Sequence, residues 1–289
     1  MINKDVYFFE LKRNFKTWLY WFIALGVMSI VMLLLFKLVN SIDIPYQQYI
    51  DQFGLSSMFG LSLKYTIGYF GTELSVLIQL AGAIYAASLA IKLLAGEEKD
   101  RTAEFLLANP ISRKKIWASK LLALLSLLTS MVLALCLVNF LGVYVLNFGA
   151  KTANSLSDYA GFFYTFFTTL IMMLSIGCCC YLLSAFFSRR GGFGIAIGIA
   201  LFAYIISIIY TLAANSMAGG VGKDIFRIVQ YVSPFSFCDS MMCIGFLGHE
   251  KIVTSNEFWL TMIGVLIWIV ISLTALFYSR RIYYKKDIL

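Results

Sequence analysis

Few side chains in this 289-residue chain could carry out catalysis or hold a metal ion. The single histidine, His249, has no partner set for metal binding or catalysis and is expected at the surface. Four of the six cysteines lie inside apolar runs: Cys136, Cys178, Cys179 and Cys180. Buried cysteine usually behaves as a small hydrophobic residue, and no Cys pair has the CxxC spacing of a metal site.

Sequence motifs for nucleotide binding and hydrolysis are also missing. There is no GxxxxGK[ST] loop to hold phosphates and no GxGxxG after a strand. GxSxG and HExxH are absent as well. We therefore predict no catalytic residues, no metal site and no cofactor on this chain, so any energy-requiring work depends on a partner.

The composition is that of a membrane protein. Hydrophobic residues make up 61% of the chain and charged residues 13%, whereas soluble proteins are nearer one half and one quarter. The net charge of +8 is compatible with nucleic-acid binding. However, the basic residues cluster beside apolar segments, as they do in membrane proteins. We expect the lipid bilayer, and not nucleic acid, as a partner.

Six apolar stretches reach the length of about 20 residues that a helix needs to cross a bilayer. They cover residues 18–39, 71–95, 121–146, 162–187, 193–213 and 258–278. The predicted fold is therefore one all-α polytopic membrane domain, residues 1–289, with six transmembrane helices.

Basic residues predict the orientation of these spans. The side that holds both termini carries 17 of the 23 Lys and Arg residues, and the other side carries 6. Because positively charged loops stay in the cytoplasm, we predict a multi-pass plasma-membrane protein with both termini cytoplasmic.

Residues 1–17 precede the first predicted span and have an amphipathic pattern. Phe8, Leu11, Phe15 and Trp18 recur at helical spacing, with charged residues on the other faces. This pattern predicts an interfacial helix lying on the membrane. The alternative is a plain lead-in to the first span.

The most informative segment is the loop at 96–120, GEEKDRTAEFLLANPISRKKIWASK. It combines a charged start, a short apolar patch at 105–107, a break at Asn109-Pro110 and a second helix start that Ser112 is placed to cap. Exposed Phe and Leu in a cytoplasmic loop need a protein surface to cover them. That surface is either a partner or the chain's own spans.

Residues 224–248, on the predicted outer side, are largely apolar but interrupted at Ser233-Pro234. Halves of this length are too short to cross, so we predict a re-entrant helix pair; a simple extracellular loop is the alternative. Cys238 and Cys243 lie in this segment, and spacing alone leaves open whether they form a disulfide.

Polar and small residues within the spans suggest packing roles. Gln79 and Asn139 are expected to form hydrogen bonds between helices, with substrate contact as a second interpretation. Gly194 and Gly198 form a GxxxG pattern that allows close helix approach across a dimer axis.

This organisation resembles the membrane subunits of bacterial ABC transporters of the ABC-2 exporter class. The most specific resemblance is the run EEKDRTAEFLLANPISRKKIWASK, which follows the second span. The matching positions are Glu97, Glu98, Thr102, Glu104, Leu106, Leu107, Pro110, Ile111, Ser112 and Arg113. Arg101 and Phe105 lie within the same loop.

The resemblance implies a permease subunit in the bacterial inner membrane. Two such subunits, identical or homologous, would assemble with two copies of an ABC ATP-binding subunit, which would hold ATP and Mg. The loop would contain the coupling helix that docks on the ATPase, and an amphiphilic substrate such as a hydrophobic peptide, antibiotic or lipid-like molecule would be exported. A scaffold or sensor that recruits a cytosolic protein without transport is the alternative, and an intramembrane enzyme lacks residues to carry it.

Overall fold

The computed structural model describes residues 2–41, 67, 70–100, 111–147, 156–186, 192–216, 225, 229–238 and 255–285. No strand occurs among them, as the predicted all-α class requires. The long helices are α1 (Lys4–Ser41), α4 (Ser75–Asp100), α6 (Arg113–Asn147), α7 (Leu156–Phe186), α8 (Gly192–Ser216) and α11 (Ser255–Lys285). A short π-helical turn, η2 (Phe70–Leu74), precedes α4.

Each of the six predicted spans falls on one of these helices. Five helices, α1, α4, α6, α7 and α11, are long and apolar enough to cross a membrane. In α8 the corresponding apolar stretch is the shorter Ile197–Tyr210. Five spans therefore follow from the described residues, and the sixth stays a prediction.

The predicted interfacial segment is continuous with the first span. α1 runs for 38 residues without a break, so no helix boundary separates residues 4–17 from residues 18–39. Phe8 and Phe15 are exposed, as a helix lying against lipid requires. Its placement in the membrane interface stays a prediction.

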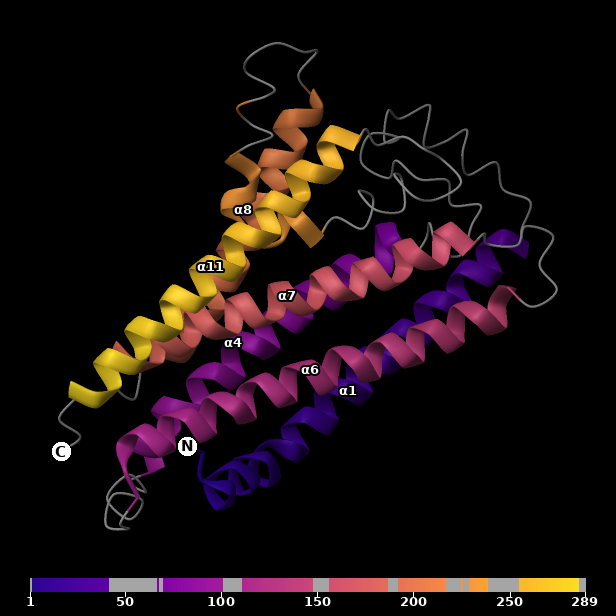
Figure 1. The fold of residues 1–289 in the computed structure, drawn as a ribbon. Coiled ribbons are helices and arrows are strands. Elements are labelled where there is room, and N and C mark those ends of the chain that lie inside the picture. Colours follow the sequence, from indigo (N-terminus) through magenta and orange to yellow (C-terminus); the bar gives the residue numbers. More distant parts are fainter. Residues whose placement is uncertain are drawn as a thin grey trace.

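α4 and α7 form the centre of the bundle (Figure 1). α1 packs along α6, α11 packs against α7, and α8 packs against α4. Small side chains allow the close approach: Ala83, Ala86, Ala87 and Ala90 of α4 are fully buried. At Gly82, a Cβ atom would lie 2.9 Å from the sulfur of Met173. The expectation that the small residues of this span serve packing is confirmed.

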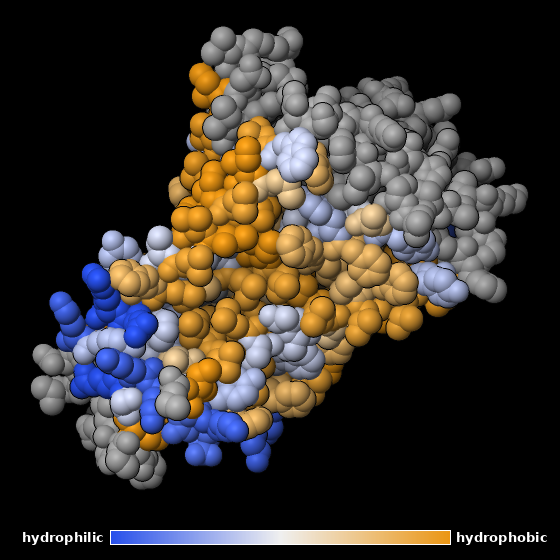
Figure 2. Space-filling model, in the orientation of Figure 1, coloured by the Kyte–Doolittle hydropathy of each residue, from blue (hydrophilic) through white to orange (hydrophobic). Residues whose placement is uncertain are grey.

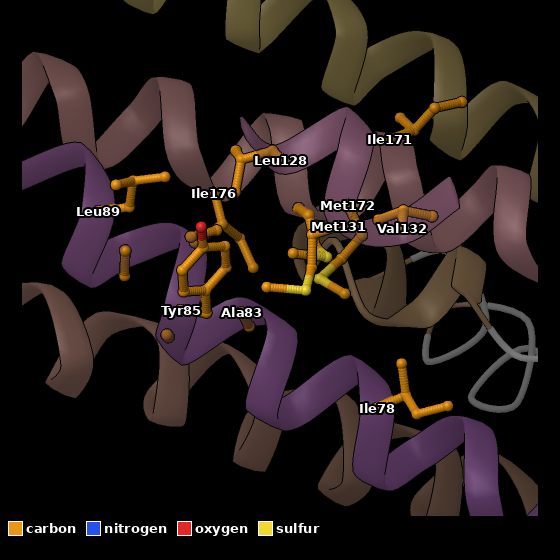
Figure 3. Close-up of a cluster of buried hydrophobic side chains, with 14 of the residues drawn as sticks. Ile78, Ala83, Tyr85, Leu89, Leu128, Met131, Val132, Ile171, Met172 and Ile176 are labelled. Atoms are coloured by element: carbon orange, nitrogen blue, oxygen red, sulfur yellow. The ribbon is translucent and has the colours of Figure 1, made fainter. Parts of the chain in front are cut away.

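Large side chains from three helices fill the core between these small residues (Figure 3). Tyr85 of α4 is completely buried among Leu128 and Met131 of α6 and Met172 of α7. Methionine is well suited to such a position because its flexible, polarisable side chain fills irregular gaps.

The outer surface of the bundle is apolar along most of its length. Exposed aliphatic and aromatic residues line α1, α8 and α11, among them Leu34, Phe202, Ile209, Leu266 and Leu273. Hydrophilic residues gather instead at the end where both termini lie (Figure 2). A soluble monomer does not expose so much continuous apolar surface, so lipid or another membrane chain covers these faces.

Candidate functional site

The predicted coupling loop connects α4 to α6 at the end of the bundle that carries the N-terminus and the end of α11. We call this the basic end. Glu97 and Glu98 lie in the last turn of α4, and Ser112 and Arg113 lie at the start of α6. The predicted loop residues between them lie outside the described residues: Arg101, Thr102, Glu104, Phe105, Leu106 and Pro110.

The second helix of the loop begins where the sequence predicts. α6 starts at Arg113, and the carbonyl of Ser112 accepts hydrogen bonds from the backbone N–H groups of Lys115 (2.9 Å) and Ile116 (3.2 Å). This helix does not end within the loop but continues as the third predicted span, 35 residues in all. A movement of the loop would therefore act on one end of a single continuous helix, α6.

Lys120 joins the two stems of the loop. Its Nζ donates a 2.7 Å hydrogen bond to the carbonyl of Leu93 on α4, and the side chain is completely buried. Leu93 lies in the last part of α4 and Lys120 in the second turn of α6, so this bond closes the base of the loop.

A cluster of charged and amide side chains surrounds this lysine, and we call it the ion cluster. Glu10 of α1 places one carboxylate oxygen 3.8 Å from Lys120 Nζ and the other 2.9 Å from Arg13. Asn14 donates to Glu10 at 3.3 Å and to the Glu10 carbonyl at 2.9 Å. Glu10, Asn14 and Lys120 are fully buried, and a buried charge is tolerated only when it is paired and hydrogen-bonded.

The N-terminus is fastened to the same part of α6. The backbone N–H of Asn3 donates to Ser119 Oγ at 2.9 Å, and Ser119 Oγ donates to the Asn3 carbonyl at 3.0 Å. The side-chain oxygen of Asn3 accepts from the N–H groups of Asp5 and Val6, which is an N-cap for α1. The cap and the anchor together fix the start of α1 on α6.

Trp117 extends these connections to two further helices. Its indole N–H donates to Ser279 of α11 at 3.3 Å, and its carbonyl accepts from the hydroxyl of Tyr181 of α7 at 3.0 Å. Through Trp117, Ser119 and Lys120, α6 is thus hydrogen-bonded to α1, α4, α7 and α11. The short stretch that follows the coupling loop is the junction of these four helices.

Unburied cations lie around this junction. Lys114 and Arg280 both approach the ring of Tyr284, at 5.7 and 5.6 Å, and Arg281 lies 4.4 Å from the ring of Phe277. Figure 2 shows the hydrophilic surface at this end of the molecule. Cations and aromatic rings of this kind are typical of the cytoplasmic membrane interface.

At the end of the bundle opposite the basic end, the segment from Gln230 to Cys238 packs between helices. We call this segment the plug. It consists of two short 3-10 helices, η3 (Gln230–Val232) and η4 (Ser236–Cys238). The break predicted at Ser233-Pro234 lies between them, but helical halves of re-entrant length are not confirmed. Residues 226–228 and 239–248 lie outside the described residues, as does Cys243.

Hydrogen bonds attach the plug to four helices, one of them α7, where the thiol of Cys238 donates to the Thr168 carbonyl at 3.3 Å. Gln79 of α4 donates to the Cys238 carbonyl at 2.8 Å. Ser233 donates to the carbonyl of Ala203 on α8 at 2.7 Å. On α11, Trp268 donates to the Tyr231 carbonyl at 3.0 Å. All of Ser233–Cys238 is buried, so this part of the chain is not a free extracellular loop.

The other predicted membrane-embedded residues are placed as follows. Asn139 is buried and donates to the carbonyl of Leu135 at 2.8 Å and to Ser29 of α1 at 3.4 Å. Gln79 and Asn139 therefore both link elements, as expected, and substrate contact stays a prediction. Gly194 and Gly198 face outward on α8, where an added Cβ would meet no atom within 4 Å.

Sequence reasoning did not foresee the ion cluster. The signal was available as Val6, Glu10 and Asn14, which recur every four residues opposite the exposed phenylalanines. The sequence predicted charged residues on the faces of residues 1–17 away from Phe8 and Phe15, and it predicted no role for Glu10, Asn14 or Lys120. The side chains of Glu10 and Asn14 instead turn toward α6.

The comparison with known protein families covers nearly the whole chain. A family model described as "ABC-2 family transporter protein" matches residues 10–288. No curated protein matches the chain. The matched region includes the ion cluster, the loop, the plug and all the long helices except the first turns of α1.

Proposed function

This chain belongs to the ABC-2 family of transporter proteins, and on that basis we propose that it is the permease subunit of an ATP-driven exporter. In this proposal a separate ATP-binding subunit, present in two copies, holds ATP and Mg and docks on the loop at residues 96–120. A second permease, identical or homologous, completes the pathway. The substrate is an amphiphile, such as a hydrophobic peptide, an antibiotic or a lipid-like molecule.

The observation that carries the proposal is the attachment of this loop. Its stems, the end of α4 and the start of α6, are joined by Lys120, and α6 is bonded there to three further helices. A loop that served only to connect two spans would need no such junction. A docking loop does need one, because a force applied by a partner must reach the helices that line the pathway.

The proposed orientation follows from the basic end. The exposed cations of α6 and α11 gather there together with both termini. The positive-inside rule then places this end, and with it the loop, in the cytoplasm of a bacterial cell. A cytosolic ATPase can reach it there.

Copurification with a coexpressed ABC ATP-binding subunit from the same organism tests the proposal. We expect the wild-type chain to retain the ATPase, and charge reversal at Glu98, Glu104 and Arg113, or Phe105→Asp, to weaken retention or ATP hydrolysis. Lys37→Glu is the matched control, because Lys37 lies on α1 far along the helix from its capped start. If all variants retained the ATPase and hydrolysed ATP equally well, the assignment of residues 96–120 as the docking loop would be rejected.

Transport assays separate the exporter from a scaffold. In reconstituted vesicles, an exporter accumulates a fluorescent amphiphile only when ATP and the partner are present. A scaffold binds the partner equally well but does not transport the amphiphile.

A further inference from the structure

The ion cluster has a geometry that packing alone does not require. Lys120 is completely buried, and two cations, Lys120 and Arg13, lie within ion-pair distance of the Glu10 carboxylate. Buried ion pairs are weak stabilisers, and replacing both partners with apolar residues is often neutral or favourable. Stability by itself is therefore a poor reason for placing these charges here.

The position of the cluster relative to the loop suggests what it does. Lys120 holds α4 through the carbonyl of Leu93 and holds α1 through Glu10. The loop connects α4 and α6 directly, but it has no covalent connection to α1 at this end. Among the described polar contacts, Glu10 with Lys120, Asn3 with Ser119 and Thr17 with Lys92 link α1 to the base of the loop.

We propose that Lys120 and Glu10 are positioning residues that make the stems of the coupling loop and the start of α1 move as one body. This inference rests on the proposed function, because it assigns a path by which loop movement reaches α1. α1 is unbroken from Lys4 to Ser41 and presents an apolar outer face. A displacement of its first turns would therefore act on one end of this continuous helix.

Three substitutions separate positioning from stability. Glu10→Gln removes the negative charge that lies 3.8 Å from the buried Lys120 and should lower thermal stability most. Lys120→Met removes the bond to α4 but leaves Glu10 paired with Arg13, which is partly exposed. Glu10→Gln combined with Lys120→Met removes both charges and should recover the stability lost in Glu10→Gln, while the links from Lys120 to Glu10 and to the Leu93 carbonyl stay broken.

Pulsed electron paramagnetic resonance measures the connection itself. Spin labels are placed at two exposed positions outside the cluster, Phe8→Cys on α1 and Lys115→Cys on α6, and the chain without these substitutions gives the labelling background. The complex with its ATPase is measured without nucleotide and with ATP and vanadate. The wild-type cluster should give one narrow distance that ATP leaves unchanged. Lys120→Met and the double variant should broaden it or shift it by about 2 Å or more.

In the complex with the ATPase, two results would overturn the inference. One is a Phe8–Lys115 distance that ATP changes in the wild-type cluster as much as in Lys120→Met. The other is a double variant that regains stability and the narrow, ATP-independent distance together. Measurement of the chain alone in lipid nanodiscs distinguishes this failure from failure of the proposed function. If no ATPase binds, the proposed function fails, whereas equal distance widths for wild type and Lys120→Met in nanodiscs refute the connection itself.

Discussion

At the scale of single residues, close contacts with glycine show which positions are most constrained. Gly264 of α11 lies under the ring of Tyr231, where an added Cβ would be 2.5 Å from the ring. That ring cannot easily move, since its hydroxyl lies 3.0 Å from Thr261 Oγ1 and its carbonyl accepts from Trp268. Sequence alone could not single out this glycine among 21, because its partner lies more than 30 residues away.

Gly264→Ala is expected to destabilise the protein. Overpacking costs about 1–3 kcal/mol, which outweighs the roughly 1 kcal/mol by which alanine favours a helix over glycine. Thermal unfolding of the purified chain in detergent measures the difference. Gly26→Ala is the control, because a Cβ there meets no atom within 4 Å, and it should be neutral or stabilising. A Gly264→Ala protein as stable as this control would contradict the packing described.

The polar residues divide into those that sequence reasoning could place and those that it could not. Gln79 and Asn139 stand alone in apolar runs, so a hydrogen bond to another element was their expected role, and both make one. Glu10 lies in a segment rich in charge, where nothing local distinguishes a buried acid from a solvated one. Its burial depends on the tertiary approach of α6.

At the scale of elements, the apolar runs predicted the helices well because the length needed to cross lipid is a strong constraint. Their ends were harder to predict. α6 begins at Arg113 and α11 continues to Lys285, beyond the predicted spans 121–146 and 258–278. Hydropathy detects only the part of a helix that lies in hydrocarbon, and these helices continue into the polar region. The plug was predicted only as an interrupted apolar segment, since its attachment depends on distant side chains.

Gln79→Leu tests the attachment of the plug. The substitution keeps the size of the side chain but removes its donor to the Cys238 carbonyl. A hydrogen bond between membrane helices is worth about 0.6–2 kcal/mol, so we expect a loss of stability in that range and faster reaction of Cys238 with a small maleimide.

The control for this measurement is Ser130→Ala. Ser130 is exposed on α6, and its hydroxyl bonds to Leu127 within its own helix. Equal maleimide rates for Gln79→Leu and Ser130→Ala would show that Gln79 does not hold the plug.

At the scale of the whole molecule, the apolar outer faces of α1, α8 and α11 are a property of the single chain. Family membership was predictable because the loop motif and the run of spans occur together, and the family match extends over residues 10–288. Hydropathy does not tell which outer face meets lipid and which would meet the proposed second permease, because both environments are apolar.

Gly194→Leu combined with Gly198→Leu tests whether the outward glycines of α8 pack against a second permease. Because an added side chain meets no atom of its own chain there, the fold and thermal stability should be retained while the dimer of permeases is lost. Mass photometry of the complex measures the subunit number. The control is Val270→Leu, which adds bulk to an exposed position on α11. A double variant that still dimerises would place the interface elsewhere.

The central claim is that the loop at residues 96–120 receives a separate ATPase, and site-specific photo-crosslinking tests it most directly. A photoreactive amino acid is introduced at Phe105 or, for comparison, at Tyr144, which is exposed near the other end of α6. In cells that also express the ATP-binding subunit, we predict a crosslink to that subunit from position 105 and none from position 144. The absence of a crosslink from 105, or equal crosslinking from both positions, would contradict the account.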